Sequence, residues 1–176
     1  MRAAAPAHAR DRAGLPGVAG AGGAGAAPDG GHVSAPAATA PYAQIGGDAG
    51  VRALVDRFYD LMDLEPAYAA LRALHPTTLE GSRDKLYWFL SGWLGGPDLY
   101  VERHGHPRLR ARHLPFVITR VERDQWLACM QQAMAELGLE GALAQRLAAS
   151  FFDTADWMRN TPDPAPDHAP DAGRAR

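Results

Sequence analysis

Apolar residues recur at steps of three and four in four long stretches of the chain, and this spacing limits the possible folds more than any other feature. Between residues 51 and 62 the repeat places seven apolar side chains on one side of a helix, namely Val51, Leu54, Val55, Phe58, Tyr59, Leu61 and Met62. The same spacing predicts long helices over residues 79–94, 120–137 and 140–159. The residues expected on the buried side of the helix over 120–137 are Trp126, Leu127, Met130, Ala133, Met134 and Leu137. No segment alternates with a period of two over a useful length. The pattern therefore predicts an all-α fold.

Prolines, glycines and capping residues mark where these helices begin and end. The residues expected to cap the starts of three long helices are Asp48, Thr77 or Thr78, and Thr119 together with Glu122. Pro66 and Pro107 are expected to open short helices that end near residues 73 and 113. Gly95-Gly96-Pro97 ends the helix over 79–94. The polar, glycine-containing stretch over 98–106 is predicted to be a loop.

Composition changes sharply near both ends of the chain. Of the 14 prolines, five precede residue 42 and four follow residue 161, while alanine and glycine dominate the first forty positions. Such segments hold too little large apolar surface to offset the entropy of ordering them. We therefore expect disordered tails over 1–40 and 161–176, and one helical domain over 41–160.

Charge and cysteine content narrow the class of protein. Lys plus Arg number 18 against 20 for Asp plus Glu, so a net charge of -2 gives no electrostatic footprint for nucleic acid or an anionic membrane. Cys129 is the single cysteine, which excludes an internal disulfide. No apolar run approaches the roughly 20 residues that span a bilayer, and the N-terminus lacks the apolar core of a secretory signal. We expect a cytoplasmic protein that binds neither nucleic acid nor membrane.

Histidines and arginines are concentrated in the stretch over 105–116. Together with the preceding loop it brings His104, His106 and His113 close in sequence, and imidazole suits zinc, iron, copper and nickel. A zinc site needs about four ligands, and neither a cysteine pair nor a His-Glu-x-x-His helix supplies the others. His113 differs because it ends a short helix that faces an apolar strip. It could be a core histidine bonded to the backbone or a metal ligand.

Polar groups among the predicted apolar helix faces indicate that a ligand is bound between these faces, which apolar side chains alone would otherwise fill. Tyr59, His75 and Trp126 each bring a hydrogen-bond donor into a zone that is otherwise apolar, and buried donors need partners. A flat, apolar ligand with a polar adduct at its centre would satisfy these donors. Haem with bound dioxygen is such a ligand.

The order of several short motifs resembles the second group of bacterial truncated haemoglobins over about residues 41–160. The motifs are Tyr42 to Gly47, Phe58-Tyr59, Trp93 with Gly95-Gly96-Pro97, the run over 105–116, and Glu122-Arg123-Asp124 before Trp126. The Gly-His-Pro-Arg-Leu-Arg run that ends in Arg-His is highly specific for that group, whereas the glycine pairs alone are a weak signal. The resemblance implies a truncated globin, a two-over-two helical sandwich that holds haem b.

The resemblance also implies roles for individual residues. His113 resembles the proximal iron ligand, while Tyr59, His75 and Trp126 resemble the distal residues that hydrogen-bond a bound ligand. Ser82 is a small residue where many globins place a distal histidine, and it leaves a ligand entry. The remaining residues expected to hold the haem are Leu86, Phe89 and Phe116 through apolar contact, and Lys85 and Arg112 through the propionates.

Three distal donors imply high affinity for dioxygen and slow release, because each hydrogen bond to a partly charged acceptor contributes on the order of 1.5 to 3 kcal/mol. Slow release favours redox chemistry, nitric oxide detoxification, peroxide turnover or sensing over bulk oxygen transport. Nitric oxide and carbon monoxide are expected as further ligands, and a catalytic cycle would need an external electron donor. Two alternatives stay open. One is a haem-free helical interaction module whose arginines over 103–112 bind an acidic partner, and the other is a metal hydrolase built on His104, His106 and His113.

Overall fold

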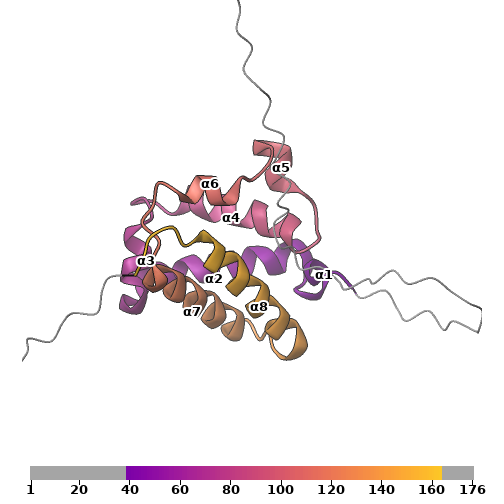
Figure 1. Ribbon diagram of the computed structural model, residues 1–176. Helices are drawn as coiled ribbons and strands as arrows, with labels where there is room; N and C mark the ends of the chain where they lie inside the picture. The colour runs from indigo at the N-terminus through magenta and orange to yellow at the C-terminus, as the bar shows by residue number, and fades with distance from the viewer. Residues whose placement is uncertain (1–38, 164–176) are drawn as a thin grey trace, which may run out of the picture.

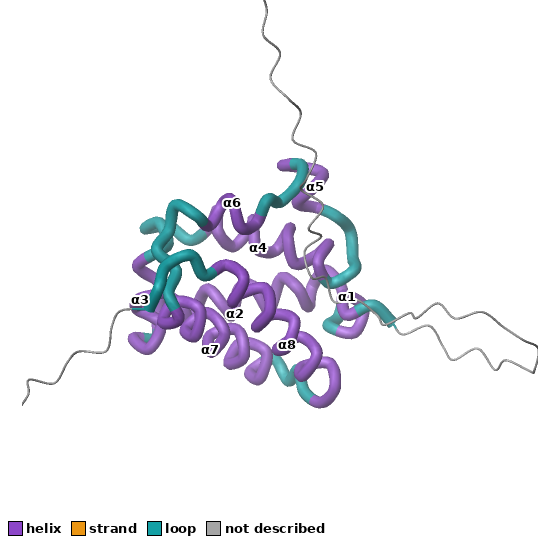
Figure 2. Tube along the Cα trace, viewed as in Figure 1, coloured by secondary structure: helices purple, strands orange, loops and turns teal. Residues whose placement is uncertain are grey.

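The computed structural model describes residues 39–163, and this part of the chain is entirely helical, without a strand (Figure 1, Figure 2). The elements are α1 (Pro41–Gln44), α2 (Gly47–Leu64), the 3-10 helix η1 (Pro66–Tyr68), α3 (Ala69–Ala73), α4 (Glu80–Trp93), α5 (Leu99–His104), α6 (Leu109–His113), α7 (Arg120–Glu136) and α8 (Gly141–Met158). The all-α prediction is confirmed. Most of both expected tails lies outside the described residues.

The four long helices form two packed pairs. Helix α2 packs against α4, α7 packs against α8, and α2 also packs against α7, so that one pair lies on the other (Figure 1). This is the expected two-over-two sandwich. Helix α6, which carries the end of the histidine-containing stretch, packs against α8. None of the helices described here has the length and apolar character needed to cross a membrane.

Helix α2 supplies the centre of the core. All seven side chains predicted from its apolar spacing are buried, and they are the only buried residues of that helix. Burying a large aliphatic or aromatic side chain contributes about 1.5–3 kcal/mol, so this stripe is a main source of stability. The thiol of Cys129, on α7, is fully buried against α2 and donates to the Phe58 carbonyl at 3.2 Å. Burial raises the pKa of this thiol to about 12.

Helix α7 follows its predicted stripe except at Trp126, which is half-buried, and at its end. Leu127, Met130, Ala133 and Met134 are buried as expected. Leu137 was expected to be buried as well but is 41% exposed. The helix ends one residue earlier, and the chain turns away at Gly138, whose φ is 70°.

The capping box predicted at the start of α7 is confirmed. The Thr119 hydroxyl accepts a hydrogen bond from the Val121 backbone N–H at 3.1 Å, and the Glu122 carboxylate accepts one from the Thr119 N–H at 2.8 Å. These bonds satisfy backbone donors that the first turn of a helix leaves free. The bonds from Thr119 lower the pKa of Glu122 against the opposing effect of burial.

Two other predicted caps are wrong. Helix α2 begins before Asp48, after Gly46 with a φ of 102°, and the Asp48 carboxylate instead accepts a hydrogen bond from the Tyr87 hydroxyl. Helix α4 begins after Leu79 without a side-chain cap, so neither Thr77 nor Thr78 has the predicted role. In both places the tertiary packing positions the helix start without the expected cap.

The loop predicted over 98–106 is also wrong, because residues 99–104 form α5. Tyr100 is 8% exposed, and α5 packs against α4, so burial of this aromatic ring favours a helical turn that the polar local sequence does not favour. The short helix predicted from Pro107 begins two residues later at Leu109, because Arg108 has a left-handed backbone with a φ of 45°.

Candidate functional site

A cavity of about 510 Å³ lies between the two helix pairs, within the size range of about 300–1,000 Å³ that is typical of ligand pockets. Its walls come from α2 to α8 and from the turns after α3 and α6. The structure brings all ten residues proposed from the sequence to this one cavity, namely Tyr59, His75, Ser82, Lys85, Leu86, Phe89, Arg112, His113, Phe116 and Trp126. Residues from five separate parts of the chain therefore share one site.

His113 is the last residue of α6, and its ring is half-buried in the cavity wall. Its Nδ1 lies 2.7 Å from the Leu109 carbonyl oxygen, one helical turn earlier. Because a carbonyl only accepts hydrogen bonds, Nδ1 carries the proton and Nε2 keeps its lone pair. Histidines that bind metals are commonly oriented in this way by a backbone carbonyl. The ring is therefore prepared to bind a metal ion through Nε2.

The segment that follows α8 holds the backbone around His113. Asn160 donates through Nδ2 to the carbonyls of His113 at 3.1 Å and Phe116 at 2.9 Å, and its Oδ1 accepts from the Ile118 N–H at 3.1 Å. The guanidinium of Arg110 also reaches this segment, where it donates to the Arg159 carbonyl at 3.3 Å, and it donates to the Trp157 carbonyl in the last turn of α8. Sequence reasoning missed Asn160, since one amide beyond a predicted helix end carries no signal of such contacts.

Tyr59 projects from α2 and meets His75, which follows α3, with ring centroids 5.8 Å apart and nearly perpendicular planes. Burial raises the pKa of the Tyr59 phenol well above its usual range, although a hydrogen bond with Ser82 and the charge of Arg83 lower it in part. The phenol therefore stays protonated and can donate a hydrogen bond at neutral pH.

His75 differs from the expectation of a third donor. Its Nδ1 lies 3.0 Å from the Leu71 carbonyl oxygen, so Nδ1 carries the proton and donates. Burial lowers the pKa of His75, which favours the neutral ring. In that state Nε2 is an acceptor. His75 therefore offers the cavity a lone pair, and the donors in this region are Tyr59 and Trp126.

Aromatic rings form a continuous series of contacts along one wall. Trp93 stacks on Phe151 with centroids 4.9 Å apart, Phe151 meets Trp126 at 5.5 Å, and Trp126 meets Phe58 at 5.4 Å. The Trp93 indole nitrogen is buried and has no hydrogen-bond partner among residues 39–163. Trp93 and Phe151 were not among the proposed site residues, although Trp93 follows Phe89 by four positions and this spacing places both on one face of α4.

Charged groups lie along the cavity as well. Lys85 and Arg112 are exposed, and neither forms an ion pair within the described part of the chain. Arg123 is only 9% exposed, but Asp156 at 2.5 Å and Asp124 at 2.6 Å balance its charge. The cations available to an occupant of the cavity are therefore Lys85 and Arg112.

The site fits haem in its donor chemistry. An imidazole nitrogen is available to iron, the walls are largely apolar and aromatic, and Lys85 and Arg112, which form no ion pair within residues 39–163, match the two propionates. The unpartnered Trp93 N–H is a further donor for a polar group of the occupant. By contrast, His104 and His106 are exposed and do not line this cavity. Across residues 39–163 no three metal-binding side chains gather in one place, so a histidine-ligated hydrolase is not favoured.

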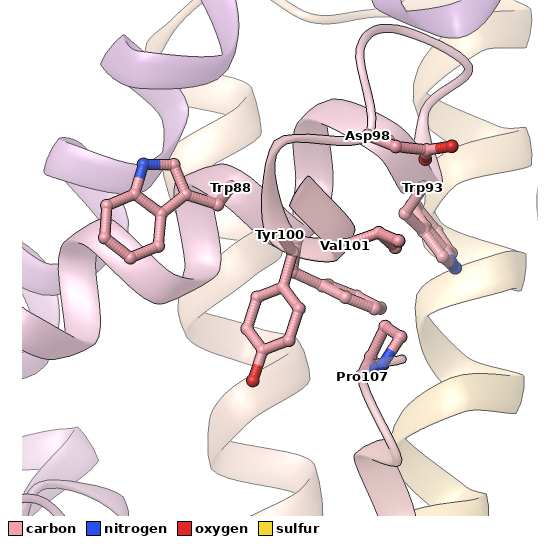
Figure 3. Close-up of a pocket in the computed structure, with 8 residues that line it drawn as sticks. Trp88, Trp93, Asp98, Tyr100, Val101 and Pro107 are labelled. Carbon is pink, nitrogen blue, oxygen red and sulfur yellow. The ribbon is translucent and has the colours of Figure 1, made fainter. Parts of the chain in front are cut away.

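A smaller cavity of about 160 Å³ lies beside the first, between α4, α5 and Pro107 (Figure 3). Phe89, Trp93, Tyr100 and Pro107 line both cavities. Helix α5, which sequence reasoning missed, supplies the ring of Tyr100 to both.

Comparison with known proteins agrees with this geometry. The model of the bacterial-like globin family matches residues 40–160. The group 2 truncated hemoglobin YjbI of Bacillus subtilis is 45% identical over 121 residues, which is 69% of this chain and 89% of that protein.

Solved structures give the same result. The group II 2-on-2 hemoglobin of Agrobacterium tumefaciens has a TM-score of 0.68 and 47% identity, covering 74% of this chain and 100% of that one. A cold-adapted truncated hemoglobin of Pseudoalteromonas haloplanktis TAC125 has a TM-score of 0.68 and 43% identity, with 70% and 99% coverage. A truncated haemoglobin of Bacillus subtilis has a TM-score of 0.64 and 44% identity, with 69% and 100% coverage. The chain belongs to the bacterial-like globin family and, within it, to the group II truncated haemoglobins.

Proposed function

We propose that this protein holds haem b through His113 and binds dioxygen with high affinity, for redox chemistry rather than bulk oxygen transport. As a truncated globin it is a haem-based protein that binds small diatomic ligands such as dioxygen. The haem-free helical module considered from the sequence is not favoured by this membership. The observation that carries the proposal is the His113 ring, which lines the cavity and whose Nδ1 is held at 2.7 Å from a backbone carbonyl, so that Nε2 is the nitrogen left for a metal.

When bound, haem would supply an iron that His113 would hold and that would bind a small diatomic ligand. The contribution of the chain on the His113 side is orientation. The Leu109 carbonyl fixes the tautomer and the rotation of the ring, and a hydrogen-bonded imidazole is a more basic ligand. Asn160 holds the carbonyl of His113 itself, so the backbone at this position is fixed as well.

Elsewhere in the same cavity, the chain contributes hydrogen-bond donors within a largely apolar wall. The Tyr59 phenol stays protonated because it is buried, and Trp126 packs between Phe58 and Phe151. Each hydrogen bond to a partly charged ligand contributes on the order of 1.5 to 3 kcal/mol, which slows release roughly 10-fold to 150-fold per donor. The Bacillus subtilis structure compared above is itself described as oxygen-avid.

Slow release leaves little use for the protein as an oxygen carrier. We therefore assign it to chemistry on the bound gas, with dioxygen-dependent removal of nitric oxide or turnover of peroxide as the candidate reactions and carbon monoxide as a further ligand. Such chemistry needs electrons from an external donor.

Absorption spectra of the ferric, reduced, oxy and carbonmonoxy forms test the assignment of His113. We expect a Soret band in the wild type and a changed ligation spectrum in His113→Ala. His106→Ala is the matched control, because His106 is exposed and lies outside the cavity. Unaltered iron ligation in His113→Ala, or no Soret band in the wild type after haem addition, would overturn the proposal.

Stopped-flow release of dioxygen tests the distal donors. Tyr59→Phe and Trp126→Phe each remove one donor and keep an aromatic ring, so each is expected to release dioxygen roughly 10-fold to 150-fold faster. Unchanged release in both variants would show that these residues do not hold the ligand.

A further inference from the structure

We propose that the outer surface of α5, α6 and their connecting loop is the docking site for an acidic redox protein that reduces the haem iron. The proposal rests on the proposed function, because it names the kind of partner that supplies its electrons. We call this surface the cationic face, and its members are Lys85, Arg103, His104, His106, Arg108 and Arg112.

The arginines of the cationic face differ from most of those elsewhere in the described chain, where Arg110 and Arg146 are the two others without an ion pair among residues 39–163. Arg103, Arg108 and Arg112 are exposed, and none of them forms an ion pair within residues 39–163. The arginines that do pair with a carboxylate are Arg52, Arg57, Arg72, Arg83, Arg120, Arg123 and Arg159. In the sequence from 99 to 113 the single carboxylate is Glu102, against four arginines. The positive charge of this surface is therefore left for a partner.

Aromatic rings connect these charges into one surface. The guanidinium of Arg103 lies 4.9 Å from the ring centre of Trp88, and the guanidinium of Arg112 lies 6.0 Å from that of Tyr100. His104 contacts both rings, at 5.4 Å from Trp88 and 5.1 Å from Tyr100. Figure 3 shows Trp88 and Tyr100 at the smaller cavity between α4 and α5. A partner bound here would cover one continuous patch.

The cationic face also borders the large cavity. Lys85, Tyr100, Pro107 and Arg112 line that cavity, so a partner on this surface would lie against the edge of its occupant. Electron transfer requires such an approach. One electron passes from the reduced partner to ferric iron, which becomes ferrous, while the partner is oxidised by one electron.

Exposed apolar side chains complete the features of a protein interface. Val101 on α5 is 46% exposed, and Leu114, directly after α6, is 58% exposed. Transient interfaces combine a small apolar centre with a polar rim, and charge complementarity increases the rate of encounter. A partner with carboxylates around its redox cofactor matches a surface of unpaired arginines with apolar residues among them.

Reduction of the ferric holoprotein by flavodoxin hydroquinone, an acidic electron donor, provides the test. The matched variants are Arg103→Glu and Arg146→Glu, which change the net charge equally. Arg146 is exposed, lies on α8 and donates to Gln44 of α1, so it belongs to a different part of the surface. Neutral lumiflavin semiquinone serves as a donor that needs no docking surface.

At low ionic strength we expect Arg103→Glu to slow reduction by flavodoxin about tenfold and Arg146→Glu to slow it less than about twofold. Neither variant should change reduction by lumiflavin, and the wild-type rate with flavodoxin should fall as salt is added. Equal slowing by both variants, or a wild-type rate that is independent of salt, would overturn the docking proposal. A wild type without a Soret band would instead refute the proposed function, and it would do so before any rate is measured.

Discussion

Removal of the Asn160 side chain should destabilise the protein through the segment that carries His113. Asn160→Ala deletes four hydrogen bonds, to the carbonyls of His113 and Phe116, from the N–H of Ile118 and from the Thr161 hydroxyl. A typical intramolecular hydrogen bond contributes a net 0.5–1.5 kcal/mol. Because Asn160 is half-buried, water can replace part of each bond, and we expect a loss of about 1.5–3 kcal/mol in the free energy of unfolding.

Urea denaturation of the holoprotein, followed by far-ultraviolet circular dichroism, measures this loss against the wild type. Thr161→Ala is the control, because its hydroxyl donates a single bond to Asn160 Oδ1 at 3.0 Å and touches neither carbonyl. It should cost no more than about 1 kcal/mol. Asn160→Asp separates the two ends of the amide, since it keeps the oxygen that accepts from Ile118 and loses the donors to His113 and Phe116.

Amide hydrogen exchange at Ile118 provides a local readout. Protection of this amide should be lost in Asn160→Ala and retained in Asn160→Asp. A loss below about 0.5 kcal/mol for Asn160→Ala, or an equal loss for Thr161→Ala, would refute the view that the segment after α8 holds the backbone at His113.

Two further predictions concern glycines and pH. Gly50→Ala should destabilise the protein strongly, because its Cβ would overlap the Ile45 carbonyl. Gly81→Ala has open space around its Cβ and a helical backbone, so it should stabilise the protein by about 0.5–1 kcal/mol. Thermal unfolding of both variants checks this, and similar effects of the two substitutions would contradict it. Stability should decrease as the pH rises above about 10, the pKa of an unfolded tyrosine, because the pKa of folded Tyr59 is higher and the unfolded chain then binds fewer protons. Urea midpoints between pH 8 and 11 check this, and a smaller decrease is expected in Tyr59→Phe; an identical decrease there would exclude Tyr59 as the cause.

The sequence predicts most of this fold where apolar spacing is regular. Every predicted core residue of α2 is buried, because that helix packs against neighbours on both sides and its whole stripe is covered. The spacing fails at α5, where one buried tyrosine orders a polar segment through contacts with α4 that no local pattern encodes. The predicted helix cap also fails at Asp48, whose carboxylate accepts a hydrogen bond from the Tyr87 hydroxyl, thirty-nine positions away.

The site was more predictable than the contacts that support it. The residues proposed from motifs all line one cavity, because the motif order reflects the family and hence the fold. The contacts of Asn160 and Arg123 depend on partners far away in the chain. The tautomer of His75 depends on which backbone carbonyl lies within hydrogen-bond distance of its ring. These are properties of the folded structure, and sequence spacing carries no information about them.

The rate at which the buried thiol of Cys129 is chemically labelled reports how often α2 and α7 separate. Its sulfur is fully covered between α2 and α7 and bonded to Phe58, and burial raises the pKa of the thiol, so a thiol reagent cannot modify it in the closed molecule. Each modification therefore records one separation of the two helices at the centre of the sandwich. Because this is the single cysteine, labelling rates with and without haem would report directly how far the cofactor holds the two helix pairs together.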